Sequence, residues 1–128
     1  MKLLDTDLLV AALRGQRDAA SYLRDHLDEV ATSTVTAAEL FAGAAGSQRA
    51  EEGANAIAEM LGGMGLIPFA IRHARAFGAL KSARARSGRP GGPLDLMIAA
   101  IAVSETATLV TRNTRDFEGH AGLQIESW

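Results

Sequence analysis

The sequence contains no cysteine, which excludes a disulfide framework and a thiolate metal site. It also lacks any apolar run that approaches the length of a membrane span. No apolar segment of signal-peptide length precedes Asp5. These absences fit a cytoplasmic protein without a membrane partner. Aromatic residues make up only 5% of the chain, so alanine-rich helical faces remain available for close packing against another chain.

What the chain does contain is typical of one soluble domain. It has 128 residues, of which 48% are hydrophobic and 22% charged, and this is enough to build a proper core. We therefore expect a single domain over residues 1–128.

The charges are unevenly distributed along the chain. The formal net charge of -2 argues against a simple basic nucleic-acid binder. Residues 60–94, however, contain no Asp or Glu, and this segment is strongly basic. Its cations are Arg72, Arg75, Lys81, Arg84, Arg86 and Arg89. Such a segment can steer a polyanion, although a solvated helix face explains it equally well.

The first residues predict a buried strand that turns directly into a helix. Lys2-Leu3-Leu4 is followed at once by Asp5-Thr6-Asp7 and then by the apolar residues 8–13. This order is typical of an interior strand of a parallel sheet. Ligands of such sheets bind beyond the carboxyl ends of the strands, where Asp5 stands. Asp5 can also simply cap the helix that follows.

The rest of the chain alternates strand and helix patterns without an internal repeat. Further strands are predicted at residues 30–35, 66–69, 108–111 and 123–126. Helices are predicted at residues 8–13, 17–27, 36–45, 50–64, 71–86 and 93–103, with a loop at 87–92. The fold class is therefore a three-layer α/β/α domain on a mainly parallel sheet of four to five strands.

Three further acids each have a sufficient structural explanation. Glu39 lies three residues after Thr36, which is the spacing of a capping box. Asp95 is the third residue of a helix that begins at Pro93, where the helix dipole favours a carboxylate. Asp116 follows a strand in a polar loop.

Taken together, the four acids Asp5, Glu39, Asp95 and Asp116 indicate a site. Each is predicted just after a strand or in the first turn of a helix, so all should meet at one edge of the sheet. Clustered carboxylates repel one another unless cations lie between them, and all-oxygen sites suit Mg²⁺ or Mn²⁺. Two such ions about 3.5–4 Å apart can hold an attacking water and a leaving phosphate-ester oxygen in line. Leaving these four acids aside, the rest of the chain carries a formal charge of +2.

Four motifs make the chain resemble the PIN-domain ribonucleases of the VapC toxin type. They are Leu3-Leu4-Asp5-Thr6, Thr36 to Leu40, Pro93 to Ala100 and Leu109 to Phe117, and the closing residues 122–128 are similar as well. Each motif is weak by itself, but four in order at these spacings are specific. The resemblance spans nearly the whole chain.

This resemblance implies an RNA-cleaving enzyme with Mg²⁺ or Mn²⁺ bound by Asp5, Asp95 and Asp116, and by Glu39 directly or through water. It implies supporting roles for Thr6, Thr111 and Asn113. It also implies a homodimer and a cognate antitoxin that covers the cleft. Two positions depart from the family pattern, since Asp7 adds a fifth acid and Gly91 replaces an apolar residue.

Basic residues near these motifs are the candidate RNA contacts. Arg112 and Arg115 flank the fourth motif and can meet phosphate oxygens, or they can belong to a solvated loop. Arg84, Arg86 and Arg89 end the basic segment. The three histidines have no metal-ligand spacing, and we expect them at the surface or partly buried.

Three other functions are compatible with parts of this pattern. Asp5-Thr6-Asp7 resembles the start of haloacid-dehalogenase-like phosphatases, but the later lysine and acidic pair of that class are missing. A phosphoacceptor signalling domain would need a lysine after one of the last strands, and no lysine follows Lys81. A non-catalytic PIN-like RNA-binding module is disfavoured because all four acids are present.

Overall fold

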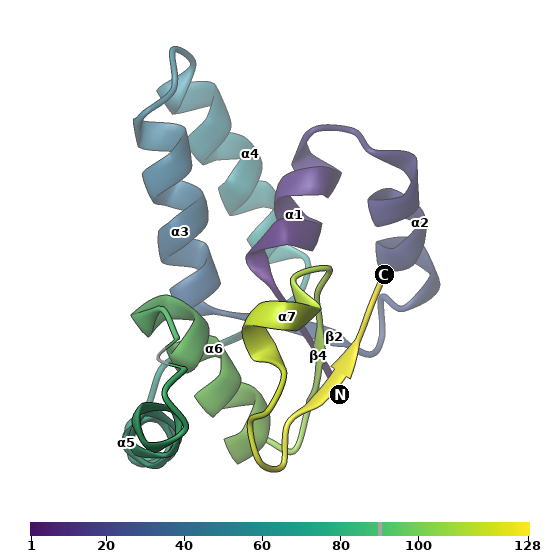
Figure 1. Ribbon diagram of the computed structural model, residues 1–128. Helices are drawn as coiled ribbons and strands as arrows, with labels where there is room; N and C mark the ends of the chain where they lie inside the picture. The colour runs from purple at the N-terminus through teal and green to yellow at the C-terminus, as the bar shows by residue number, and fades with distance from the viewer. Residues whose placement is uncertain (90) are drawn as a thin grey trace.

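The computed structural model describes residues 1–89 and 91–128, so Pro90 of the predicted 87–92 loop lies outside the described residues. Five strands form one parallel sheet in the order β3-β2-β1-β4-β5. The strands are β1 (Lys2–Leu4), β2 (Val30–Ser33), β3 (Gly65–Ile67), β4 (Thr108–Val110) and β5 (Gln124–Glu126). The helices are α1 (Thr6–Leu13), α2 (Arg17–Asp25), α3 (Thr34–Ala45), α4 (Ala50–Gly62), α5 (Ile71–Arg86), α6 (Pro93–Ser104) and α7 (Thr114–Phe117). Figure 1 shows their arrangement.

Both faces of the central strand β1 are buried. Successive side chains of a strand point to opposite faces. Leu3 packs in a cluster with residues of α5 and α6, whereas Leu4 packs in a second cluster with residues of α1, α3 and α4. The predicted three-layer α/β/α architecture on a parallel sheet is therefore confirmed, with five strands.

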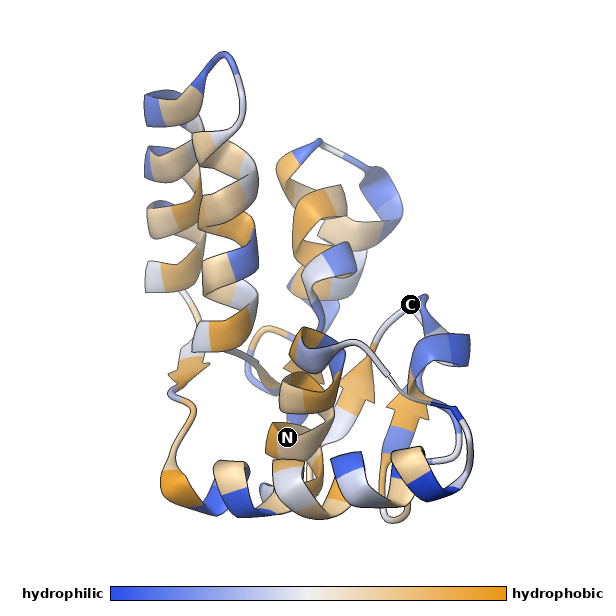
Figure 2. Cartoon of the chain, turned by 60° about the vertical axis from the view of Figure 1, so that its left-hand side comes forward, coloured by the Kyte–Doolittle hydropathy of each residue, from blue (hydrophilic) through white to orange (hydrophobic). Residues whose placement is uncertain are grey.

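Helix α6 is apolar nearly all round because it lies between the sheet and α5. Ala99, Ala100 and Ala102 are fully buried, and their small side chains allow the helix to pack closely. Figure 2 shows α6 mainly in apolar colours, whereas α5 alternates between hydrophilic and apolar residues along its length. Helix α5 thus forms an outer layer, and its basic residues Arg72, Arg75, Lys81 and Arg86 are exposed.

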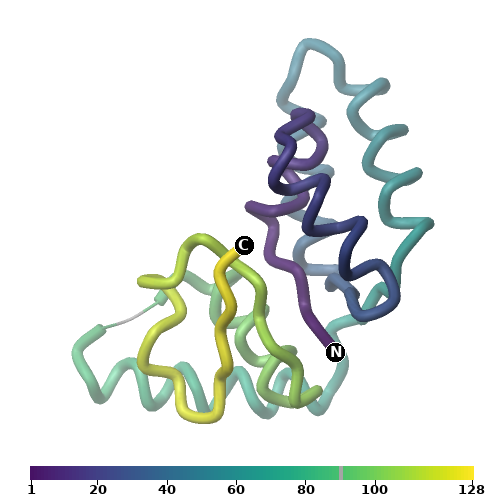
Figure 3. Tube along the Cα trace, turned by 90° about the vertical axis from the view of Figure 1, so that its right-hand side faces the viewer, coloured from purple at the N-terminus to yellow at the C-terminus, as the bar shows by residue number. Residues whose placement is uncertain are grey.

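The chain reverses its direction across the sheet next to β1. From β1 it proceeds outward through β2 to β3, and it then returns to β4 on the other side of β1. In Figure 3 the purple and blue segments from the first half and the green and yellow segments from the second half lie on opposite sides of this point. The carboxyl ends of β1 and β4 therefore border the topological switch point, where open α/β sheets bind their ligands.

Several predicted boundaries differ from the structure, and two differences affect elements of the site. Strand β2 ends at Ser33, because the Ser33 side chain accepts a hydrogen bond from the backbone N–H of Thr36 at 3.1 Å and caps α3. Thr34 and Val35, which we expected in the strand, are consequently helical. The short helix α7 lies in a segment for which only a polar loop was expected.

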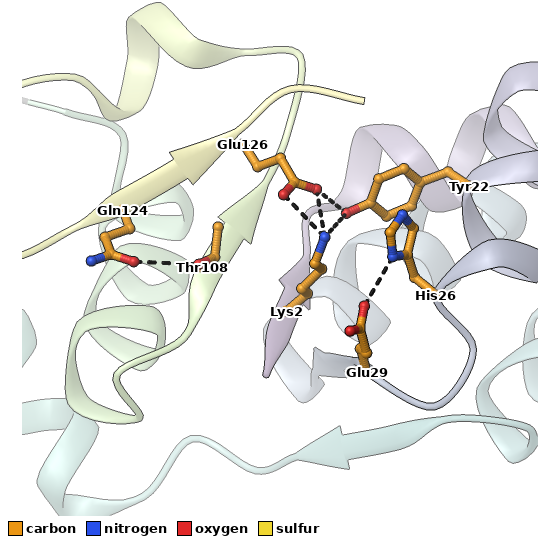
Figure 4. Close-up of polar contacts among 7 residues, drawn as sticks. All are labelled: Lys2, Tyr22, His26, Glu29, Thr108, Gln124 and Glu126. Carbon is orange, nitrogen blue, oxygen red and sulfur yellow. Dashed lines mark hydrogen bonds and ion pairs between the residues drawn. The ribbon is translucent and has the colours of Figure 1, made fainter.

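The edge strand β5 is fastened to the rest of the molecule by a polar cluster (Figure 4). The ammonium group of Lys2 donates to both carboxylate oxygens of Glu126 at 3.0 Å, and the hydroxyl of Tyr22 donates to the same carboxylate. Burial, followed by the hydrogen bond to Glu126, raises the pKa of Tyr22 to about 12. These contacts join β1, α2 and β5. Within the described residues, no helix is long and apolar enough to cross a membrane.

Candidate active site

Asp5 lies at the switch point and is held by hydrogen bonds on both carboxylate oxygens. Its Oδ1 accepts from the backbone N–H of Thr6 at 2.8 Å, and its Oδ2 accepts from the hydroxyl of Thr111 at 2.7 Å. The residue is only 4% exposed. Burial, aided by the negative charges of Asp7 and Asp95, raises the pKa of Asp5 to about 6. Asp5 does cap α1, as one interpretation proposed. Capping alone does not explain a buried carboxylate whose negative charge is disfavoured by its surroundings.

Glu39 is held by a hydroxyl group at the start of α1. The hydroxyl of Thr6 donates to Oε1 of Glu39 at 2.7 Å, and it lies 3.2 Å from the hydroxyl of Thr36. Glu39 is in the second turn of α3, so the predicted capping box of Thr36 and Glu39 is wrong. Ser33 is the cap instead. The fully buried Thr36 is a site residue that the sequence interpretation assigned only to capping.

Asp95 is the third residue of α6, as predicted. The cap residue is Gly92, which has no side chain for a capping hydrogen bond. A Cβ atom at this position would lie 3.9 Å from Oδ2 of Asp95. Burial, followed by the negative charges of Asp116 and Glu39, raises the pKa of Asp95. Because Asp95 also affects Asp5, the structure brings all four predicted acids to one edge of the sheet.

The loop after β4 connects Asp5 to α7. The hydroxyl of Thr111 donates to Asp5 and also accepts from the backbone N–H of Asn113 at 3.0 Å. Asn113 precedes α7 and is exposed, and Asp116 is the third residue of this helix and is also exposed. Asp95 and Asp116 together line a polar pocket of about 200 Å³. Its other lining residues are Arg84, Arg89, Gly91, Gly92 and Arg115.

The predicted cations occupy different environments. Arg86, Arg89, Arg112 and Arg115 are exposed, but Arg84 is only 7% exposed. The solvated-face alternative is therefore wrong for Arg84, and its contact with RNA stays a prediction. Arg84 is buried because it turns under α7, where one of its terminal nitrogens donates to the backbone carbonyl of Asp116 at 3.1 Å. His73 also differs from expectation, because it is completely buried.

The fifth acid, Asp7, is directed toward the C-terminal segment. Its Oδ2 accepts from the backbone N–H of Arg112 at 2.7 Å, and its Oδ1 lies 3.4 Å from the indole nitrogen of Trp128. The guanidinium of Arg112 stacks on the Trp128 ring at 3.5 Å and also contacts Asp18. Asp7 and Arg112 therefore fasten the loop that carries Thr111.

The donor set of this edge fits a hard divalent cation. Asp5, Glu39, Asp95 and Asp116 offer carboxylate oxygens, and the raised pKa values of Asp5 and Asp95 indicate negative charge that a cation would relieve. In the part of the chain that the structure describes, no three acidic or histidine side chains are close enough to hold one ion as they stand. No hydrogen bond within residues 1–89 and 91–128 fixes the carboxylate of Asp95 or Asp116, so these two can turn toward a shared ion.

A parallel α/β sheet with carboxylates gathered at its switch point defines a class of domain suited to metal-assisted hydrolysis of phosphate esters. The comparison with known families identifies the member of this class. The model of the PIN domain matches residues 2–123, and the chain therefore belongs to the PIN-domain family. The family assignment leaves the haloacid-dehalogenase and phosphoacceptor interpretations without support.

Characterised relatives and solved structures match over nearly the full chain. Ribonuclease VapC2 of Haemophilus influenzae is 31% identical over 127 residues, which cover 98% of this chain and 96% of the relative. The tRNA(fMet)-specific endonuclease VapC of Shigella flexneri is 34% identical over 128 residues, with the same coverage. A crystal structure of VapBC2 from Rickettsia felis bound to a promoter DNA fragment contains a chain that superposes with a TM-score of 0.93. That chain is 28% identical, and the match covers 99% of this chain and 98% of the other.

Proposed function

We propose that this chain is an endoribonuclease that uses Mg²⁺ or Mn²⁺, and that it acts as the toxin of a toxin–antitoxin pair. The observation that carries the proposal is the gathering of Asp5, Glu39, Asp95 and Asp116 at the switch point, where burial and neighbouring negative charges raise the pKa values of Asp5 and Asp95. The names of the relatives, which include ribonucleases and a tRNA-specific endonuclease, support RNA as the substrate. The proposed location is the cytoplasm, where such a substrate would be met.

In this mechanism the four carboxylates hold the cation and the hydroxyl groups orient the carboxylates. A bound divalent ion would lower the pKa of a water molecule and stabilise charge on the phosphate. Thr111 fixes Asp5, and Thr6 fixes Glu39, each through a hydrogen bond of 2.7 Å. This leaves Asp95 and Asp116 to adjust. Asn113 supports the arrangement through its backbone, which holds the hydroxyl of Thr111 in place.

Exposed arginines beside the acids are the proposed RNA contacts. Arg89 and Arg115 line the same polar pocket as Asp95 and Asp116, so a phosphate group at the acids would lie near two guanidinium groups. Arg86 extends this basic surface along α5, and its side chain also contacts Ser82. Arg112 is a weaker candidate because Trp128 and Asp18 already occupy its guanidinium.

The groove beside Glu39 supports an antitoxin as the partner. It lies between α1 and the α3–α4 hairpin, measures about 610 Å³ and is lined partly by Val10, Leu13, Leu40 and Ile57. The matched crystal structures include VapBC complexes, for example that of DNA-bound VapBC from Salmonella typhimurium. We propose that an antitoxin segment enters this groove and covers Glu39.

We also propose that the chain forms a homodimer. A strictly monomeric species in light scattering at high protein concentration would contradict the dimer.

Cleavage of RNA by purified protein tests the enzymatic proposal. The protein should cut single-stranded regions of RNA in Mg²⁺ or Mn²⁺, with water as the nucleophile and 5′-phosphate ends in the products. Asp5→Asn and Asp95→Asn should abolish cleavage without unfolding the domain. Asp28→Asn is the matched control, since Asp28 is exposed and precedes β2 at the opposite end of the sheet. Cleavage that persists in excess EDTA would rule out the mechanism.

The same assay addresses the alternative of a non-catalytic RNA-binding module. Such a module would bind RNA with a salt-dependent affinity but leave it intact in either metal ion. Intact RNA after incubation with folded, metal-treated protein would favour this alternative.

A further inference from the structure

Arg84 is a buried cation for which the proposed mechanism has no use. Its side chain leaves α5 and makes one hydrogen bond, from a terminal nitrogen to the backbone carbonyl of Asp116 at 3.1 Å. Its Nε atom is buried and has no hydrogen-bond partner among the described residues. Within residues 1–89 and 91–128, no carboxylate lies close enough to form an ion pair with it. A guanidinium buried in this way costs folding free energy, and an apolar side chain would serve packing better.

The position of the guanidinium indicates what its unfavourable burial stabilises. Helix α7 is a single turn of four residues, so its backbone carbonyls have few helical partners. Arg84 supplies a donor to one of them, and that carbonyl belongs to Asp116. No hydrogen bond in the described part of the chain holds the Asp116 carboxylate, so this side chain is positioned mainly by its backbone.

The chain that leaves α7 also passes close to the same guanidinium. Gly119 has a φ of +87°, and a Cβ atom there would lie 3.6 Å from Nη1 of Arg84. Burial, followed by the positive charge of Arg84, lowers the pKa of His120. The guanidinium is therefore enclosed by α7 and by the turn that follows it. On its other side it lines the pocket that contains Asp95 and Asp116.

We propose that Arg84 is a positioning residue that holds the backbone of α7 so that the Asp116 carboxylate faces Asp95. It acts through the carbonyl of Asp116 and not by contact with RNA. This inference rests on the proposed nuclease function, because it assigns a purpose to the position of Asp116. Helix α5 thereby contributes one cation, Arg84, that supports the acidic site from within, while its other cations lie on the surface of the helix.

Amide hydrogen exchange measured by NMR tests the positioning directly, without RNA or metal. The reporters are the amides of Asp116 and Glu118, which donate to Asn113 and Thr114. The reference amides are those of α6, which report global stability. In Arg84→Met the protection of the α7 amides should fall at least tenfold relative to the α6 amides, and Arg84→Lys should fall between this variant and the wild type. Arg86→Met, an exposed change on the same helix, should leave the ratio unaltered.

Two functional readouts accompany the exchange measurement. In Arg84→Met the rise in melting temperature on addition of Mg²⁺ should be much smaller than in the wild type. For RNA cleavage kcat should fall at least tenfold while KM changes little, because a residue that positions a metal ligand does not bind the substrate. Arg84→Lys should recover part of both effects.

Several outcomes would overturn the proposal. One is an equal loss of protection in α6 and α7, which would make Arg84 a general stabiliser of the fold. Another is an unchanged Mg²⁺ effect in Arg84→Met. If Arg84→Met does not fold, the α7-to-α6 protection ratio of Arg84→Lys decides, and a ratio equal to that of the wild type refutes the positioning role. A wild-type protein that neither responds to Mg²⁺ nor cleaves RNA would instead refute the proposed function, while the exchange ratio would still report on Arg84.

Discussion

Asp95 experiences two opposing influences on one carboxylate. Its place in the first turn of α6 favours the negative charge by about 0.3–1 kcal/mol. Burial and the charges of Asp116 and Glu39 disfavour it, and the raised pKa of Asp95 shows that the unfavourable influences are larger. The ionised side chain therefore lowers the stability of the metal-free fold at neutral pH. Such a residue is retained at a cost in stability, which is typical of functional sites.

The substitution Asp95→Asn should separate these influences. In EDTA the variant should melt at the same temperature as the wild type or higher, because the repulsion is removed. In Mg²⁺ the wild type should gain about 2.7 kcal/mol when the ion is present at 100 times its dissociation constant, and the variant much less. Four melting curves provide the measurement. A variant that melts lower in EDTA and keeps the full Mg²⁺ effect would reduce Asp95 to a helix-capping role.

Glu105 shows how one partly buried acid can support a buried base. The backbone N–H of Ala70 donates to Nδ1 of His73 at 2.9 Å, so the proton of the neutral ring lies on Nε2, which donates to Glu105 at 2.7 Å. The hydrogen bond from Arg72, followed by that from His73, lowers the pKa of Glu105 below its ordinary value of 4.5. Glu105 thus joins the start of α5 to the end of α6.

The stability contributed by the Glu105 charge should depend on pH. Because the pKa of Glu105 is lower in the folded state, the contribution is present above pH 4.5 and is lost as the pH falls through the folded-state pKa. Glu105→Gln should accordingly be less stable than the wild type at pH 7, and the difference should shrink toward pH 3 in urea unfolding. Glu105→Ala should lose a further amount of about 1–3 kcal/mol, since buried His73 then lacks an acceptor. A constant difference between wild type and Glu105→Gln at all pH values would contradict this assignment.

At the scale of elements, the start of α3 matters because this helix carries Thr36 and Glu39. Ser33→Ala removes the side-chain cap and should lower the free energy of unfolding by about 1 kcal/mol. Ser47→Ala is the matched control, because Ser47 is exposed just beyond the other end of α3 and contacts only the carbonyl of Ala44. Urea unfolding of the two variants provides the comparison. Equal losses would show that Ser33 does not determine where α3 begins.

The long elements could be predicted from the sequence because their patterns are local. Helix α6 begins at Pro93 as expected. The strand predicted at residues 66–69 is shorter at its end, because β3 stops at Ile67, before Pro68. The single turn α7 could not be predicted, since four residues are too few to show a helical period. The β2–α3 boundary was misplaced because β-branched Thr34 and Val35 favour a strand locally, whereas the Ser33 cap starts the helix.

The candidate site could be predicted as far as the topology of a parallel sheet determines which residues share an edge. The four acids could be placed because each follows a strand or lies near the start of a helix, and parallel strands bring such positions together. The burial of Arg84 and His73 was not predictable. Both lie on a helix with an exposed basic pattern, and only its packing against α6 and the segment around α7 determines which cations turn inward.

At the scale of the whole molecule, the acids of the site and the cations of the basic segment occupy separate but neighbouring regions of the fold. The four acids Asp5, Glu39, Asp95 and Asp116 meet at the switch point, while the acid-free segment of residues 60–94 supplies the outer helix beside it. Arg89 and Arg115 stand where the two regions meet, on the pocket that Asp95 and Asp116 line. This arrangement leaves cations free to bind phosphate groups next to the acids.

Salt dependence of RNA binding should identify the arginines that contact phosphate. For single-stranded RNA each such contact contributes about 0.7 to the slope of log affinity against log salt concentration. Arg89→Gln and Arg115→Gln, each introduced into the cleavage-deficient Asp5→Asn protein, should therefore reduce the slope by about 0.7 and weaken binding. Arg49→Gln is the matched control, because Arg49 is exposed at the far end of the α3–α4 hairpin and already pairs with Glu52. Slopes that remain at the Asp5→Asn value in both pocket variants would mean that these guanidinium groups are merely solvated, and RNA would then have to approach the acids from another side.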